Sequence, residues 1–276
     1  MLFRSGLYDS SVKPHYSLDA DLVLINPQFE TVYAVKHFSR NQIYRAKSVE
    51  GIKSINALYI DMTQWRNPET KKERTILVFG FDPIKPVFNL TEVNQNLNNL
   101  KMLNRVLFDQ AGRPEFGPIS QLLDANKNLK VQLGKKTVEV IGLFSLGASF
   151  AADGNAMISD STFFHIFNSR TPEQVDVGLI KLYPSQDIEK IKRNIQKILP
   201  EEKVIVLTLH EFAEREKIYW ANSTPIGFIF ALGTGVGFIV GTVIVYQILY
   251  SDVSEHLSEY ATLKAMGYGD FYLIKV

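Results

Sequence analysis

Apolar residues are gathered into one long run near the C-terminus, whereas the rest of the chain mixes apolar and polar positions. No Asp, Glu, Lys or Arg occurs between Lys217 and Asp252. A helix of about 20 apolar residues crosses the hydrocarbon core of a bilayer, and aromatic residues often flank it at both interfaces, as they do here. The run therefore predicts a transmembrane helix at residues 225–250. A long helix in a soluble core is the alternative.

Three glycines give this run a second pattern. Gly233, Gly237 and Gly241 repeat as G-x-x-x-G, which places them near one face of a helix and lets another helix approach closely. We predict a packing face there, with simple tolerance of glycine in lipid as the alternative. A phosphate-binding loop is disfavoured, because no Lys follows and the last position of G-x-G-x-x-G falls on Phe238 or Val240.

Residues 10–207 carry shorter patterns, which together predict an α+β fold. Short apolar or alternating runs bounded by turn residues predict strands, and apolar positions three or four apart predict helices. The predicted strands are 20–27, 52–65, 74–83, two within 130–147 that meet at Gly134 and Lys135, 175–184 and 203–209. The predicted helices are one within 39–52 between Ser39 and Gly51, one within 89–109, one that begins near Asp160 or Ser161 after a small-residue loop, and one within 185–200 whose Ile188, Ile191, Ile195 and Ile198 face inward.

The segment before the membrane run predicts a stalk. Thr208 and Glu211 match a capping box, in which each side chain satisfies a backbone N–H group at the start of a helix. We predict a stalk helix within 208–224. Pro225 then interrupts the helix or begins a new one, so we predict a hinge at this residue.

A second helical pattern follows the membrane run. Tyr260, Leu263 and Met266 recur at helical spacing, and Gly267 is a typical helix stop. A helix that lies on the membrane surface and a helix that docks into a partner both fit this pattern.

Composition narrows the chemistry that the chain can perform. The net charge is +1, which gives no case for nucleic-acid binding, and the chain has no cysteine, which excludes disulfides and thiolate sites. None of the five histidines has a metal-ligand partner at a recognised spacing, and neither Ser145 nor Ser149 lies in a nucleophile elbow. We therefore expect no catalytic residue, no metal and no cofactor.

Both ends of the chain indicate a fragment. The N-terminus lacks the apolar core of a signal peptide. Near the C-terminus, the segment GYGDFYLIKV begins what resembles another apolar run and then stops.

The segment EYATLKAMGY resembles the signature that follows the second membrane helix of MacB/FtsX-type ABC permeases. An acidic residue precedes an L-[KR]-A-[IM]-G core, and the matching positions are Glu259, Leu263, Lys264, Ala265, Met266 and Gly267. Further segments over nearly the whole chain resemble the DevC-type permeases of cyanobacterial DevBCA-type exporters, namely DADLVLINPQFE, QWRNPET, NRVLFDQAGRPEFGPI, GASFAADGN and GFIVGTVIVYQILYSDVSEHL.

This resemblance implies a domain organisation. Residues 10–207 would form a periplasmic α+β domain of two mixed lobes similar to the MacB periplasmic core, followed by the stalk and one transmembrane helix. Residues 1–9 would be the tail of a missing first membrane helix. Residues 251–276 would hold a cytoplasmic coupling segment, with the six signature residues as the ATPase contact, and the start of the next membrane helix.

The resemblance also implies partners and a location. Such permeases are homodimers in the bacterial inner membrane, here with residues 10–224 in the periplasm. Their partners are a cytoplasmic ABC ATPase, which hydrolyses the ATP, a periplasmic membrane-fusion protein, a TolC-like outer-membrane channel and membrane lipid. The permease would pass the ATPase motion to its periplasmic domain and export a lipid or glycolipid-like cargo. The alternative function is a single-pass membrane sensor or adhesin with an extracytoplasmic ligand-binding domain.

Overall fold

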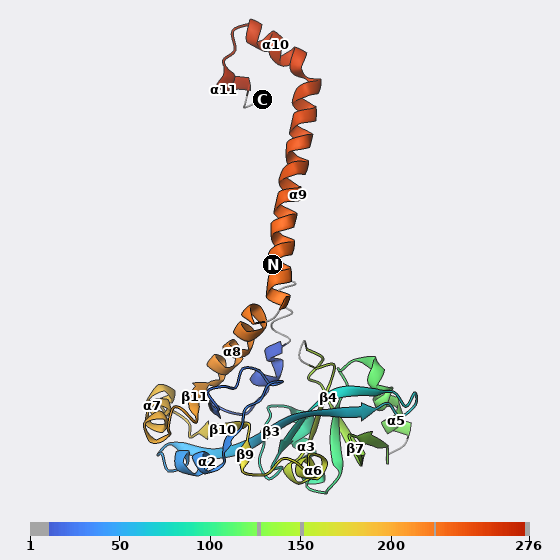
Figure 1. Ribbon diagram of the computed structural model, residues 1–276, viewed down its shortest axis with the longest axis vertical. Coiled ribbons are helices and arrows are strands. Elements are labelled where there is room, and N and C mark those ends of the chain that lie inside the picture. The colour runs from blue at the N-terminus through green and yellow to red at the C-terminus, as the bar shows by residue number, and fades with distance from the viewer. Residues whose placement is uncertain (1–10, 126–127, 150–151, 224, 274–276) are drawn as a thin grey trace. The chain divides into compact units, whose positions relative to one another are not determined.

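A computed structural model describes residues 11–125, 128–149, 152–223 and 225–273 (Figure 1). The chain divides into two compact units, Met1–Trp220 and Ala221–Val276. The first holds a mixed sheet with helices around it, and the second is helical. Residues 1–9, expected to be the tail of a missing membrane helix, lie outside the described residues.

The first unit has the α+β composition predicted from the sequence. Its strands are β1 (Leu22–Ile25), β2 (Phe38–Ser39), β3 (Ile52–Arg66), β4 (Glu73–Phe81), β5 (Arg105–Asp109), β6 (Lys130–Leu133), β7 (Lys136–Phe144), β8 (Asn155–Ser159), β9 (Gln174–Val175), β10 (Val177–Leu182) and β11 (Ile205–Thr208). Its helices are α2 (Asn41–Ala46), α3 (Thr91–Gln95), α4 (Leu97–Leu100), the 3-10 turn η1 (Pro114–Phe116), α5 (Ile119–Ala125), α6 (Asp160–Ile166), α7 (Ile188–Ile198) and α8 (Leu209–Asn222). The second unit contains α9 (Pro225–Glu255), α10 (Leu257–Ala265) and α11 (Asp270–Leu273).

The main sheet is continuous and turns back on itself at one end. Its strand order is β11-β1-β10-β3-β4-β8-β5-β7-β6, and β6 pairs again with β3. The pairing Trp65↔Leu133 therefore closes the strands from β3 to β6 into a ring without a free edge. The 15-residue strand β3 belongs to both parts of the sheet, because its first half pairs with β10 and its second half with β4. The two lobes are thus two halves of one sheet, with α2 and α7 at one end of the unit and α5 at the other (Figure 1).

The core lies on both faces of this sheet. In β4, Ile76 and Val78 belong to a cluster that includes the ring interior, whereas Leu77 and Phe79 belong to a cluster on the opposite face. A strand buried on both faces has no polar side, which is why its sequence is a continuous apolar run. Inside the ring the indole of Trp65 is fully buried and donates from Nε1 to a backbone carbonyl 3.2 Å away.

Two predicted segments are corrected by the structure. The helical spacing predicted within 89–109 extends only through α3 and α4, and the last five residues form strand β5. Helix α4 ends at Leu100. The backbone turns at Asn104, whose φ is 62°, and the β-branched and aromatic residues that follow pair with β7 and β8. The segment Asn155–Ser159, interpreted as part of a loop, is strand β8, which is buried between β4 and β5.

Two smaller differences concern helices. Residues Ile119–Ala125, for which no element was predicted, form α5. In α7 only Ile191 and Ile195 are buried, whereas Ile188 and Ile198, predicted to face inward, are 40% and 38% exposed. An eleven-residue helix on one face of a sheet buries the middle of its apolar stripe, and its ends project past the sheet.

Candidate functional site

Helix α8 begins with the predicted capping box, which is confirmed. The backbone N–H of Thr208 donates to Oε2 of Glu211 at 2.7 Å, and the N–H of Glu211 donates to Oγ1 of Thr208 at 3.2 Å. Lys192 of α7 also donates to both carboxylate oxygens at 2.6 Å. Burial alone would raise the pKa of Glu211, but the bonds from Lys192 and Thr208 outweigh it and hold that pKa below its ordinary value.

The variant Glu211→Gln tests this charge. Glutamine keeps the capping box, so only the ionic contact with Lys192 is lost, and we expect stability at neutral pH to fall by less than about 1 kcal/mol. Because the folded-state pKa is lowered, the contribution is complete above the ordinary value of 4.5 and is lost as the pH falls through the folded-state value. Urea midpoints of the two proteins from pH 7 to pH 3 should therefore converge at acid pH. A difference that is constant with pH would contradict this account.

A buried carboxylate on α8 connects this helix to the sheet domain. Glu216 is only 1% exposed, yet it lies in the charged segment EREK. Its Oε1 accepts from Thr31 Oγ1 at 2.6 Å and from Trp220 Nε1 at 2.8 Å. Its Oε2 accepts from the Val32 backbone N–H at 3.2 Å. These three hydrogen bonds compensate for the burial of the carboxylate, and they fix α8 against the loop that follows β1.

A histidine completes the surroundings of this carboxylate. His15 is buried, its Nε2 lies 3.5 Å from Oε2 of Glu216, and neither ring nitrogen has a hydrogen bond to another described residue. Its ring packs 4.5 Å from that of Phe212, and Trp220 packs edge-on against Tyr33 at 5.9 Å. The sequence analysis did not identify this cluster, since His15 and Glu216 are far apart in the chain.

Arg215, the neighbour of Glu216, adds a second attachment. Its Nε donates to the Phe29 carbonyl at 2.8 Å, and its Nη2 donates to the Pro27 carbonyl at 2.7 Å. Two adjacent residues of α8 therefore hold the same loop through a carboxylate and a guanidinium. We call His15, Thr31, Arg215, Glu216 and Trp220 the stalk anchor.

Helix α9 is long and apolar enough to cross a membrane over Phe228–Glu255, and none of that span is buried within the described chain. Helix α8 ends at Asn222 and α9 begins at Pro225, and a hinge at this proline stays a prediction. Apart from the backbone of α9 itself, no atom of the described residues lies within 4 Å of the position that a Cβ would take at Gly233, Gly237 or Gly241. Their role as a packing face also stays a prediction.

Helix α10 carries the signature residues and ends in a Schellman turn. The N–H of Tyr268 donates to the Leu263 carbonyl at 3.2 Å, and the N–H of Gly267 donates to the Lys264 carbonyl at 3.1 Å. Gly267 has a φ of 94°, a value that favours glycine because it lacks a Cβ. The glycine of the signature thus ends the helix immediately after Met266.

The signature residues differ in how exposed they are. Glu259, Lys264, Ala265 and Met266 are exposed, and the side chain of Met266 is 63% accessible. Leu263 is half-buried in the second unit. A methionine side chain is flexible and apolar, so an exposed one can adapt to many apolar surfaces. Among the described residues no group of three His, Cys, Asp or Glu side chains could hold a metal ion.

Comparison with known proteins gives similarities of fold. No family model matches the sequence, and no curated protein does. The extracellular domain of the noncanonic ABC-type transporter YknZ from Gram-positive bacteria is similar at 15% identity, over 68% of this chain and 99% of that one, with a TM-score of 0.46. The periplasmic region of MacB from Actinobacillus actinomycetemcomitans is similar at 9% identity, over 72% and 94%, with a TM-score of 0.49.

A domain of a putative permease protein from Porphyromonas gingivalis is also similar, at 11% identity over 70% of this chain and 90% of that one, with a TM-score of 0.43. The three structures are thus domains of an ABC-type transporter, of MacB and of a putative permease protein. Because the identities and TM-scores are low, the functional proposal rests on the residues of this chain.

Proposed function

We propose that this chain is part of the permease subunit of an ATP-driven exporter of the MacB/FtsX type. The observation that carries the proposal is α10. The residues that resemble the family signature lie in and directly after this helix. Glu259, Lys264 and Met266 are exposed, and a glycine turn ends the helix. This helix directly follows one of membrane-spanning length in the sequence. An exposed apolar side chain beside a fixed helix end is suited to anchor α10 in a pocket of a partner such as a cytoplasmic ATPase.

The stalk anchor supports the mechanical part of the proposal. A permease that holds no ATP site must carry force between an ATPase and its extracytoplasmic domain. Glu216 and Arg215 attach α8 to the loop after β1 through buried and half-buried hydrogen bonds. Helix α8 ends at Asn222 and α9 begins at Pro225, so α8 is the element of the sheet domain nearest in sequence to the membrane-length helix. We expect movement of α9 to reach the sheet domain through α8.

The remaining features of the proposal follow the DevC-type resemblance. We place residues 10–224 on the periplasmic side of a bacterial inner membrane and α10 in the cytoplasm. The complete protein would be a homodimer that packs through the face formed by Gly233, Gly237 and Gly241. Its partners would be an ABC ATPase, a membrane-fusion protein and a TolC-like channel, and its cargo a lipid or glycolipid-like molecule.

Photo-cross-linking tests the ATPase contact. A photoreactive amino acid replaces Ala265, an exposed signature residue, in the full-length protein in its native membrane. We expect an adduct with a protein that contains a P-loop ATPase domain, identified by mass spectrometry. The same probe at exposed Ser258, outside the signature, is the matched control and should give much less adduct. An adduct with a signalling kinase, or equal labelling from both positions, would contradict the proposal and favour a single-pass sensor.

A further inference from the structure

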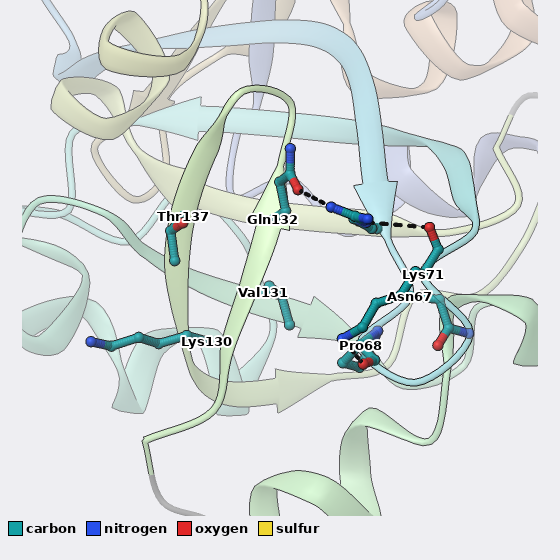
Figure 2. Close-up of a pocket in the computed structure, with 8 residues that line it drawn as sticks. Asn67, Pro68, Lys71, Lys130, Val131, Gln132 and Thr137 are labelled. Carbon is teal, nitrogen blue, oxygen red and sulfur yellow. Dashed lines mark hydrogen bonds between the residues drawn. The ribbon is translucent and has the colours of Figure 1, made fainter.

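A cationic hollow lies where the ring of strands closes. Its volume is about 310 Å³, and it is lined by Arg66, Asn67, Pro68, Lys71, Lys130, Val131, Gln132 and Thr137. The β3–β4 turn forms one wall and the β6–β7 hairpin the other (Figure 2). Three of these residues are cations and none is an Asp or Glu. We call the space that these eight residues line the basic hollow.

The turn that forms one wall is held rigidly. Asn67 is 5% exposed, and its Oδ1 accepts from the backbone N–H groups of Glu69 at 2.9 Å and Thr70 at 3.0 Å. Its Nδ2 donates to the Glu115 carbonyl at 2.9 Å. Lys71 adopts a φ of 60°, a backbone conformation that residues other than glycine rarely take. Backbone strain of this kind costs free energy and is concentrated at functional sites.

The cations retain unused hydrogen-bonding capacity. Arg66 donates from Nε to the Lys71 carbonyl at 3.3 Å and from Nη1 to Gln132 Oε1 at 3.1 Å, so the guanidinium is oriented (Figure 2). Its Nη2 has no hydrogen bond to another described residue. The side-chain ammonium of Lys130 has neither a hydrogen bond nor an ion pair within the part of the chain that the structure describes. Among the described residues, the ammonium of Lys71 donates to the Pro68 carbonyl alone, at 2.6 Å.

Two carboxylates flank the hollow without lining it. Glu73 is opposite Arg66 in the β3–β4 register, and Glu139 is opposite Lys130 in the β6–β7 register. Glu139 lies 3.4 Å from Arg105, and neither acid lines the hollow. The positive charge therefore has no partner inside the space that it borders.

We propose that the basic hollow binds a phosphate-type oxyanion, carried either by a lipid headgroup or by a small soluble molecule. An oriented guanidinium beside two ammonium groups matches the charge and the acceptor geometry of a phosphate. A space of about 310 Å³ is at the small end of ligand sites and holds a headgroup rather than a whole lipid. This site does not depend on the permease assignment, because it belongs to the sheet domain alone.

The test is calorimetric titration of the full chain in a neutral detergent. The probes are glycerol phosphate and dihexanoyl phosphatidylglycerol below its micelle concentration, with dihexanoyl glycerol, which has the same acyl chains but no phosphate, as the control. Equal affinity for glycerol phosphate and for the anionic lipid would show that the phosphate group is sufficient for binding and that the acyl chains add nothing. Tighter binding of the lipid identifies a lipid source. Both outcomes support the site, whereas binding of neither probe, or equal binding of dihexanoyl glycerol, overturns it.

Variants then locate the binding. Lys130→Gln removes a cation whose ammonium has no hydrogen bond or ion pair among the described residues, so the fold should be unaffected, and we expect about a tenfold loss of affinity. Lys101→Gln is the matched control, because Lys101 is exposed, donates only to Asn98 at 2.8 Å and does not line the hollow. It should change affinity by less than about twofold. Equal losses in the two variants would show non-specific attraction and overturn the proposal.

Discussion

Replacing Glu216 with alanine is expected to destabilise the sheet domain by at least about 3 kcal/mol. The substitution leaves three donors without their acceptor, namely the Thr31 hydroxyl, the Val32 N–H group and the Trp220 indole. Each unpaired buried donor costs on the order of 1–3 kcal/mol. The end of α8 should then detach, and the emission of Trp220 should shift to the red. Urea unfolding of the full chain, followed by tryptophan fluorescence, measures both effects.

Glu214→Ala is the matched control on the same helix. Glu214 is 42% exposed and lies 3.2 Å from Lys217, so its loss should change stability by less than about 0.5 kcal/mol. Glu216→Gln keeps one acceptor oxygen and should be intermediate. If Glu216→Ala and Glu214→Ala unfold at the same urea concentration, the stalk anchor does not hold the helix.

Replacing Met266 with aspartate is expected to abolish export by the full-length protein. If Met266 enters an apolar pocket of the ATPase, a carboxylate there must be desolvated without a partner, which costs several kcal/mol. Each 1.4 kcal/mol lowers affinity about tenfold, so docking should weaken by at least about a hundredfold. Cargo export and ATPase co-purification are the two measurements. The urea midpoint of the sheet domain should remain that of the natural protein, since the substitution lies outside it.

Leu257→Asp provides the comparison for this variant. Leu257 begins α10 and is 62% exposed, against 63% for Met266, but it lies outside the signature. It should lose much less activity. Export that persists in Met266→Asp, or an equal loss in both variants, would remove the docking role from α10.

The parts of the fold that were predicted correctly are those with a strong local pattern. The hairpin of β6 and β7 was predicted from two apolar runs around Gly134, whose φ of 59° matches the expected turn. Strand β8 was missed because its five residues follow a run of Gly, Ala and Ser with no polar alternation. It is a strand because β4 and β5 pair with both of its edges, and these partners are distant in sequence.

The candidate sites also differ in whether a local sequence pattern predicts them. The exposed signature of α10 was predicted from its own ten residues. The stalk anchor was not, because EREK has the composition of a solvated helix face and its partners Thr31 and Val32 lie nearly two hundred residues earlier, 185 in the case of Thr31. The basic hollow was also missed, since Arg66 and Gln132 meet only when β6 pairs with β3.

The sequence by itself determined the features whose interactions stay within a few residues. These are the membrane-length helix, the capping box at Thr208 and the glycine that ends α10, because hydropathy, capping and φ preference act between near neighbours. Only the tertiary structure decided that the sheet closes through Trp65 and Leu133, that Glu216 is buried, and that three cations border one hollow. Such contacts depend on which distant segments pack together, and side-chain type alone does not specify that choice.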